Sequence, residues 1–235
     1  MSLPRLRLEE CTLKDGRWLI DEKQAHHLIR VRRCSTGSLA EGLLSGERIE
    51  LRLLCEDSLV FAEELSRVRE EEPTIKLELI LALLKNDQLD DSLRFAAETG
   101  ASAIHLISCE RSVPKYSGIR LEDKMSRWRK ILAESTKQAG SASPPKLSPP
   151  LSLMELNLKI IPECRFAAIL SPEAELLSKI EYESPAAIAI GPEGDWTDSE
   201  VKFLLDNNFR PVSLGKKILR ASTAVAVSCG WFSLN

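Results

Sequence analysis

The sequence predicts an α/β protein with a parallel sheet, preceded by a smaller β-rich domain. After Pro73, short apolar segments alternate with helical ones, as in a parallel sheet covered by helices on both faces. Before it, short strand-like runs are punctuated by glycines, which is typical of a small β-barrel. The polar run Glu70-Glu71-Glu72-Pro73 has the composition of a linker. We therefore expect domains at 1–72 and 73–235.

The first domain has four predicted strands and one helix. Asp21 is suited to cap a helix over 22–30, because Ala25, Leu28 and Ile29 then share one face. The predicted strands are 18–20, 38–44, 48–53 and 59–62.

In the second domain the pattern alternates regularly. Gly100 follows a helical run as a C-terminal cap, and 140–150 is expected to be a Pro/Ser loop. The predicted strands are 75–84, 103–107, 166–170, 186–190 and 211–214, and the predicted helices are 87–98, 121–138, 199–207 and 224–232.

The composition limits the class of protein. The 235 residues are 43% hydrophobic and contain no apolar run of the roughly 20 residues that a membrane span needs. We therefore expect a soluble, cytoplasmic protein. Its six cysteines are scattered, with no Cys-x-x-Cys, so we expect reduced core thiols and no metal. The net charge is −3, but 1–33 and 110–150 are basic and could hold a polyanion. Ordinary fluctuation of surface charge would give the same pattern.

Two turns of the last third carry the strongest functional signal. One follows the apolar strand 186–190 as Gly191-Pro192-Glu193-Gly194, and the other contains Leu214-Gly215. Gly191 and Gly194 allow positive φ and close backbone approach, and Thr197 with Glu200 forms a capping box for the next helix. Two such turns at the carboxyl edge of one sheet make a crevice in which ligands bind. A structural tight turn is an equally good interpretation of the first, and no dinucleotide or P-loop motif is present.

Arg220 ends the second turn. Ile218 and Leu219 before it would wall an adenine, and Arg220 would stand at the mouth of the crevice as a fixed cation. The alternative is a surface arginine at a helix start, where the helix dipole is unfavourable for it. Among the histidines, His105 lies in an apolar strand and fits a packed core residue, whereas His26 and His27 lie in the predicted helix of the first domain.

These motifs resemble one family, the bacterial 16S ribosomal RNA uridine-N3 methyltransferases (RsmE-like), within the SPOUT superfamily. The two turns resemble its G-P-E-G-G and L-G-x-R-I-L-R-x-E-T-A patterns. Further similar segments follow in order along the chain: Pro4-Arg5, His26-His27-Leu28 with Val31-Arg32-Arg33, Lys85 with Asp87, Glu98-Thr99-Gly100, Glu110-Arg111-Ser112-Val113, and the set Trp128, Lys130-Ile131, Glu134, Gln138 and Gly140.

The resemblance implies a PUA-like β-barrel that docks RNA, joined to a SPOUT domain with a C-terminal trefoil knot. It implies a homodimer that methylates N3 of a uridine in 16S ribosomal RNA, on the small subunit, without a metal. S-adenosylmethionine would be held by Leu170, Gly191, Gly194, Leu214, Gly215, Ile218 and Leu219. Arg220 and Arg5 would be catalytic, stabilising the uridine anion. Arg5, His27, Arg32, Arg33 and Arg111 would contact RNA.

Four positions depart from the family pattern in ways that bear on activity. Phe95 stands in place of a lysine, Ser141 in place of an arginine, and Asp195 in place of the second glycine of G-G. Ser222 replaces a glutamate, and we expect it to cap the last helix. Two other functions therefore stay open: a SPOUT methyltransferase with a different RNA target, and a non-catalytic RNA-binding or ribosome-assembly protein.

Overall fold

A computed structural model describes residues 3–56, 59–70, 76–85 and 87–234. The chain forms two compact units, one of Met1–Glu72 with Thr136–Ser143, the other of Pro73–Ser135 with Pro144–Asn235. Most of the expected linker, and Ile75 at the start of an expected strand, lie outside the described residues.

The first unit contains a six-stranded sheet of order β1-β4-β5-β6-β3-β2. Its strands are β1 (Arg5–Arg7), β2 (Thr12–Lys14), β3 (Arg17–Leu19), β4 (Leu39–Leu44), β5 (Glu47–Glu56) and β6 (Leu59–Arg69). All pairs are antiparallel except β1 with β4. The four predicted strands are confirmed, with β6 much longer than expected. The three-residue β1 and β2 were missed because so short a segment shows no alternation.

The helix of this unit begins where it was predicted. The Asp21 side chain accepts hydrogen bonds from the Lys23 and Gln24 N–H groups at the start of α1 (Glu22–His26). The expected α-helix ends early, because His27–Val31 winds as a π-helical turn. Leu28 is buried in a core that belongs to this unit alone.

The second unit is built on a fully parallel seven-stranded sheet of order β11-β13-β10-β12-β7-β8-β9. Its strands are β7 (Leu77–Ala82), β8 (Ala103–Ser108), β9 (Lys146–Ser152), β10 (Cys164–Ala168), β11 (Glu175–Leu176), β12 (Ala186–Ile190) and β13 (Phe209–Ser213). Every residue of β12 is buried, as expected for a central strand covered on both faces. The α/β class with a parallel sheet is therefore confirmed.

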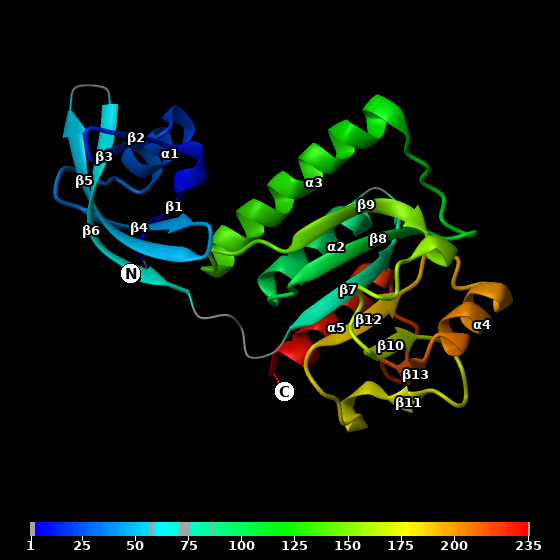
Figure 1. Ribbon diagram of the computed structural model, residues 1–235. Helices are drawn as coiled ribbons and strands as arrows, with labels where there is room; N and C mark the ends of the chain where they lie inside the picture. The colour runs from blue at the N-terminus through cyan, green and yellow to red at the C-terminus, as the bar shows by residue number, and fades with distance from the viewer. Residues whose placement is uncertain (1–2, 57–58, 71–75, 86, 235) are drawn as a thin grey trace. The chain divides into compact units, whose positions relative to one another are not determined.

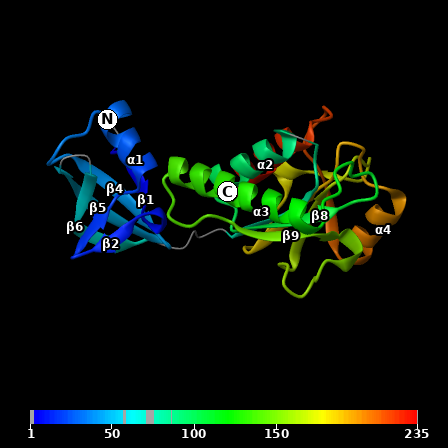
Figure 2. The same cartoon turned by 90° about the horizontal axis from the view of Figure 1, so that it is seen from above.

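Among the described residues, four helices accompany this sheet: α2 (Asp87–Glu98), α3 (Gly118–Ala139), α4 (Asp198–Asp206) and α5 (Ala221–Leu234). The α2 helix packs against α5, which also contacts β7 and β12, and α4 packs against β13 (Figure 1). Both views show α3 beside β8 and β9 (Figure 2). Short 3-10 turns occur at Leu8–Glu10, Leu153–Glu155 and Leu177–Lys179.

Three further sequence-based expectations were wrong. The expected loop 140–150 ends in β9, which includes Pro149 and Pro150 at the edge of the sheet, where a missing N–H is tolerated. The six cysteines are free, as expected, but only Cys109 and Cys229 are buried. Ser222 does not cap α5, because the helix already begins at Ala221 and Ser222 lies inside its first turn.

Candidate functional site

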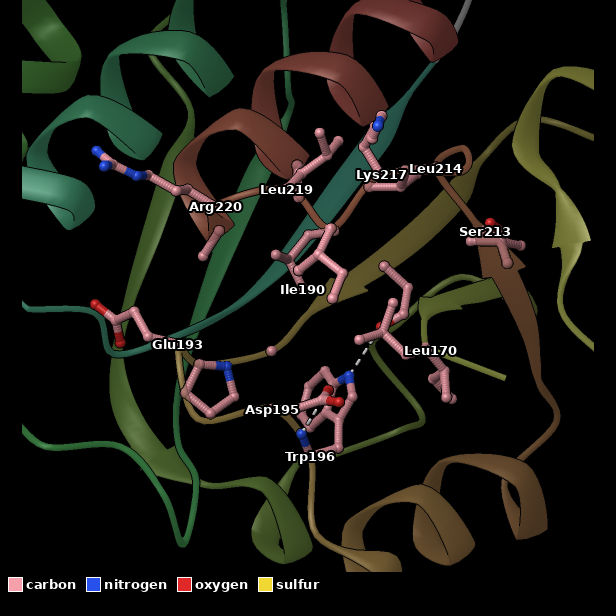
Figure 3. A pocket seen from close by; sticks show the side chains of 18 of the residues that line it. Leu170, Ile190, Glu193, Asp195, Trp196, Ser213, Leu214, Lys217, Leu219 and Arg220 are labelled. Carbon is pink, nitrogen blue, oxygen red and sulfur yellow. Dashed lines mark hydrogen bonds between the residues drawn. The ribbon is translucent and has the colours of Figure 1, made fainter. Parts of the chain in front are cut away.

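The two turns meet at the carboxyl ends of three adjacent strands, β13, β10 and β12. The chain proceeds from β7 outward to β9 and then returns to β10 on the other side of β12, so the direction of the chain switches here. Such a switch point leaves a crevice at the carboxyl edge of a parallel sheet. A cavity of ≈ 430 Å³ occupies it, which is in the size range of small-molecule sites (Figure 3).

The cavity wall includes most of the residues expected to hold a cofactor. It is formed by Gln88, Ala168, Ile169, Leu170, Ile190, Gly191, Pro192, Glu193, Asp195, Trp196, Val212, Ser213, Leu214, Gly215, Lys217, Ile218, Leu219, Arg220, Ala221 and Ala224. Of the predicted set only Gly194 is missing from this wall. Arg220, expected at the mouth of the crevice, also lines this cavity.

Trp196 explains why glycine is needed at position 191. A Cβ on Gly191 would lie 2.8 Å from the buried indole ring, closer than packed atoms approach. The indole Nε1 donates a 2.9 Å hydrogen bond to the Ala168 carbonyl at the end of β10. The tryptophan therefore ties the turn to the neighbouring strand. The sequence shows a tryptophan just after the glycine turn. It does not show which residues the indole contacts.

The positive φ of the turn lies at an unexpected residue. Neither Gly191 nor Gly194 has positive φ, whereas Asp195 has φ +62°. Asp and Asn tolerate this region better than other non-glycine residues because their short side chains bond locally. Here Asp195 Oδ1 accepts a 2.8 Å hydrogen bond from the Trp196 N–H.

Arg111 and Glu200 support the same turn from the side of β8. Arg111 donates to the Gly194 and Trp196 carbonyls at 3.0 and 3.2 Å. The Glu200 carboxylate accepts from the Glu110 N–H at 2.8 Å and from the Thr197 N–H at 2.9 Å, which completes the predicted capping box. Arg111, expected to contact RNA, thus bonds to the backbone of the first turn. Its RNA contact stays a prediction.

The carboxylate of Glu200 also affects a neighbouring thiol. Cys109 is buried, and burial together with the nearby Glu200 charge raises the pKa of its thiol well above the usual value. Cys109 therefore stays protonated at physiological pH and acts as a packed side chain.

The second turn is held far less tightly. Ser213 Oγ and the Gly215 N–H are 3.3 Å apart in a local hydrogen bond, and Gly215 has φ +126°. Ile218 is 82% exposed, and Leu170, which lines the same cavity, is 65% exposed. Two large apolar side chains at the mouth of a cavity mark a surface that a ligand would cover.

Arg220 is the residue that immediately precedes α5. Its carbonyl accepts the first helical hydrogen bond, from the Ala224 N–H at 2.8 Å. Its side chain is exposed and, within the described part of the chain, has no ion-pair or hydrogen-bond partner. A cation held at the positive end of a helix without a counter-ion is electrostatically unfavourable. Arg220 is thus available to an anionic ligand.

Arg5 lies in the first unit and is engaged there. Its guanidinium donates to the Glu41 carboxylate at 2.9 Å and to the Gln138 carbonyl at 2.6 Å, near the C-terminus of α3. Arg48 forms ion pairs with both Glu41 and Glu70, and it donates a hydrogen bond to the Gly140 carbonyl. A positive charge suits the negative end of a helix. These contacts describe a structural clamp, and the catalytic role of Arg5 stays a prediction.

The other predicted RNA contacts also belong to the first unit. His27, Arg32 and Arg33 are exposed, at and just after the π-helical turn, and Arg33 has φ +56°. His105 is buried as expected, and its Nε2 lies 2.7 Å from the Glu78 carboxylate.

The residues that depart from the family pattern have different surroundings. Phe95 packs against the core of the second unit. Ser141 Oγ bonds to the Glu70 carboxylate at 3.1 Å, within the first unit. Ser222 is buried in α5, and Asp195 lines the cavity. Only the last of these four changes the charge of the site.

The described residues contain neither a metal-binding cluster nor a membrane-spanning helix. No cluster of three or more His, Cys, Asp or Glu side chains suited to a metal ion occurs among them. No described helix is both long and apolar enough to span a membrane.

Comparisons with known proteins place this geometry in a family. Residues 70–233 match the model of an RNA methyltransferase domain. The ribosomal RNA small subunit methyltransferase E of a Synechocystis species is 30% identical over 214 residues, which cover 87% of this chain and 69% of that protein. A methyltransferase E 2 from Borreliella burgdorferi is 29% identical over 219 residues, covering 90% of this chain and 88% of that protein.

Solved structures have the same fold. The ribosomal RNA small subunit methyltransferase E of Neisseria gonorrhoeae, bound to S-adenosyl methionine, has a TM-score of 0.84 at 24% identity over 99% of this chain and 98% of that one. A Legionella pneumophila protein in complex with the same cofactor has a TM-score of 0.85 at 20% identity, covering 100% and 98%. The sequence matches and the shared fold agree: this chain belongs to the RNA methyltransferase family that includes the ribosomal RNA small subunit methyltransferases E.

Proposed function

We propose that this protein transfers a methyl group from S-adenosylmethionine to N3 of a uridine in 16S ribosomal RNA of the small subunit. The observation that carries the proposal is the cavity at the ends of β10, β12 and β13. Both sequence motifs that resemble the methyltransferases line it, in a chain that belongs to their family.

The residues of the cavity fit this cofactor. Apolar side chains of Leu170, Ile190, Ile218 and Leu219 suit the faces of an adenine. Gly191 leaves room for the buried Trp196 ring, which itself forms part of the cavity wall. Leu214 and Gly215 would complete the binding site, while Gly194 would act by shaping the turn through its carbonyl bond to Arg111. When bound, S-adenosylmethionine would supply an activated methyl group, whose carbon–sulfur electron pair stays on sulfur as the carbon–nitrogen bond forms.

Arg220 would perform the electrostatic part of the reaction. Uridine N3 is a poor nucleophile until its proton leaves, and the resulting anion places negative charge on the two neighbouring carbonyl oxygens. The exposed Arg220 guanidinium, which has no partner among the described residues, would stabilise this anion as the proton passes to water. Because Arg220 precedes α5 directly, the helix fixes its position relative to the cavity.

The finer architecture is part of the proposal. We infer a C-terminal trefoil knot in the second unit, a PUA-like barrel in the first, and a homodimer. The resemblance of the motifs and the TM-scores to the two cofactor-bound structures support the fold. The first domain, 1–72, would dock RNA through its exposed His27, Arg32 and Arg33, because cations on phosphates dominate such binding.

The test combines binding with product identification. Purified protein is titrated with S-adenosylmethionine by calorimetry and then incubated with small ribosomal subunits that lack N3-methyluridine, whose nucleosides are identified by mass spectrometry. We expect binding and formation of N3-methyluridine. Binding with methylation elsewhere would mean a different RNA target, and absence of binding would favour a non-catalytic RNA-binding protein.

A further inference from the structure

Four charged residues of the described part of the chain line the cavity, two acidic and two basic: Glu193, Asp195, Lys217 and Arg220. Glu193 is already engaged, because its Oε1 accepts hydrogen bonds from the Lys85 N–H at 2.8 Å and from Gln88 Nε2 at 3.2 Å. Its carboxylate thus bonds to the start of α2.

Asp195 is bound differently. Oδ1 accepts the Trp196 N–H, and within the described part of the chain Oδ2 has no hydrogen-bond or ion-pair partner. The local bond fixes the side chain without neutralising it. In Figure 3, Asp195 and Trp196 lie on one side of the cavity, and Leu219 and Arg220 lie on the other. Asp195 therefore presents a fixed negative charge to whatever fills the space between them.

We propose that Asp195 makes the cavity selective for the sulfonium form of the cofactor over its demethylated product. This inference rests on the proposed function. S-adenosylmethionine carries a positive charge on sulfur, whereas S-adenosylhomocysteine has a neutral thioether. The adenosine and the amino-acid end are common to both ligands, so their contributions cancel when the two affinities are compared. The two affinities then differ only through the methyl group and the positive charge on sulfur. Of these two, a carboxylate attracts only the charge.

The size of the effect follows from the exposure of Asp195. Its side chain is exposed, so water and salt screen the attraction, and we expect a preference of roughly fivefold rather than a hundredfold. The consequence is useful for turnover. Transfer of the methyl group removes the positive charge and with it the attraction to Asp195. S-adenosylhomocysteine is therefore bound more weakly than S-adenosylmethionine, which replaces it in the cavity.

Asparagine is the matched substitution. It tolerates φ +62° and retains an oxygen for the Trp196 N–H, but removes the charge. Asp195→Gly provides a second neutral variant whose backbone suits the turn. Asp198→Asn is the control, because Asp198 is an exposed carboxylate three residues away that does not line the cavity.

Dissociation constants for S-adenosylmethionine, S-adenosylhomocysteine and sinefungin are measured by calorimetry for all four proteins. Sinefungin carries a protonated amine in place of the sulfonium and should follow S-adenosylmethionine. We expect Asp195→Asn and Asp195→Gly to weaken both cationic ligands about fivefold and to leave S-adenosylhomocysteine within about twofold. Asp198→Asn should change none of the three. In the wild type, the preference should decrease from about 0.05 M to 0.5 M salt, and in Asp195→Asn it should not.

Equal weakening of all three ligands would overturn the inference, because the carboxylate would then face the common amino-acid end. So would an unchanged ratio in both neutral variants, or an equal shift in the Asp198 control. Each of these outcomes leaves the cofactor site intact. If the wild-type protein binds none of the three ligands, it is the proposed function that fails.

Discussion

The two turns that form the cavity differ in how they are held. Around the first, Arg111 donates to the Gly194 carbonyl and the Trp196 indole donates to the Ala168 carbonyl at the end of β10. Glu200 accepts from the Thr197 and Glu110 N–H groups. The second, between β13 and α5, has a local Ser213–Gly215 bond and exposes Ile218 almost completely. One wall of the cavity is thus formed by the folded protein alone, whereas the other needs a ligand to bury its apolar side chains.

This difference separates two kinds of contribution. Substitutions that break the packing or hydrogen bonds of the first turn should reduce stability and cofactor affinity together, because folding and binding use the same backbone. Substitutions in the second should reduce affinity or chemistry without affecting stability. Four measurements, ordered by the size of the expected effect, test that division.

Gly191→Val should have the largest effect. Its side chain would collide with the Trp196 ring, so the indole must move and the turn with it. We expect no S-adenosylmethionine binding by calorimetry and a lower melting temperature. Gly230→Ala is the control, because a Cβ there meets nothing within 4 Å. If Gly191→Val bound S-adenosylmethionine with wild-type affinity, the first turn would not be part of the binding site.

Arg220→Ala should reduce methyl transfer about a hundredfold, the usual cost of losing one group that stabilises developing charge. The melting temperature and the S-adenosylmethionine dissociation constant should stay close to wild type, since the side chain has no partner among the described residues. Single-turnover rates on small subunits measure the effect, and Arg220→Lys should recover part of the rate. A wild-type rate in the alanine variant would show that Arg220 is not catalytic.

Glu200→Gln should destabilise the protein by about 2 kcal/mol, because one of two N–H groups bonded to a buried carboxylate loses its acceptor. Thermal unfolding measures the loss, and cofactor affinity should decrease with it. The exposed Glu173→Gln should change neither. Loss of stability with unchanged affinity would contradict the coupling expected for the first turn.

Ile218→Ser should have the smallest effect on the fold and a clear one on binding. Because the side chain is 82% exposed, the melting temperature should not move, whereas removal of an apolar contact to the ligand should weaken S-adenosylmethionine about fivefold. Ile119→Ser, at a residue 78% exposed outside the cavity, should alter neither quantity. Equal affinities for the two variants would mean that the ligand does not cover the second turn.

Local signals in the sequence were sufficient for much of the second unit. The helix predicted over 87–98 is α2 without change, and the strand predicted over 186–190 is β12. Thr197 and Glu200 form the predicted capping box. Each of these depends on residues close together in the chain, where periodicity and capping chemistry act directly. For the same reason both turns could be assigned to one sheet edge before the strand order was known.

Partners far apart in the sequence decided the rest. Arg111 and Arg5 carry the same charge and both resembled RNA contacts, yet one bonds to the backbone around Gly194 and the other to the end of α3. The edge position of β9 and the placement of Trp196 against Gly191 were equally invisible. The sequence by itself determined which elements form and which turns carry the site, because those depend on local chemistry. Only the tertiary structure decided which side chains hold the site and which, like Arg220 and Asp195, are left to act on a ligand. That depends on long-range packing, which the order of residues does not reveal.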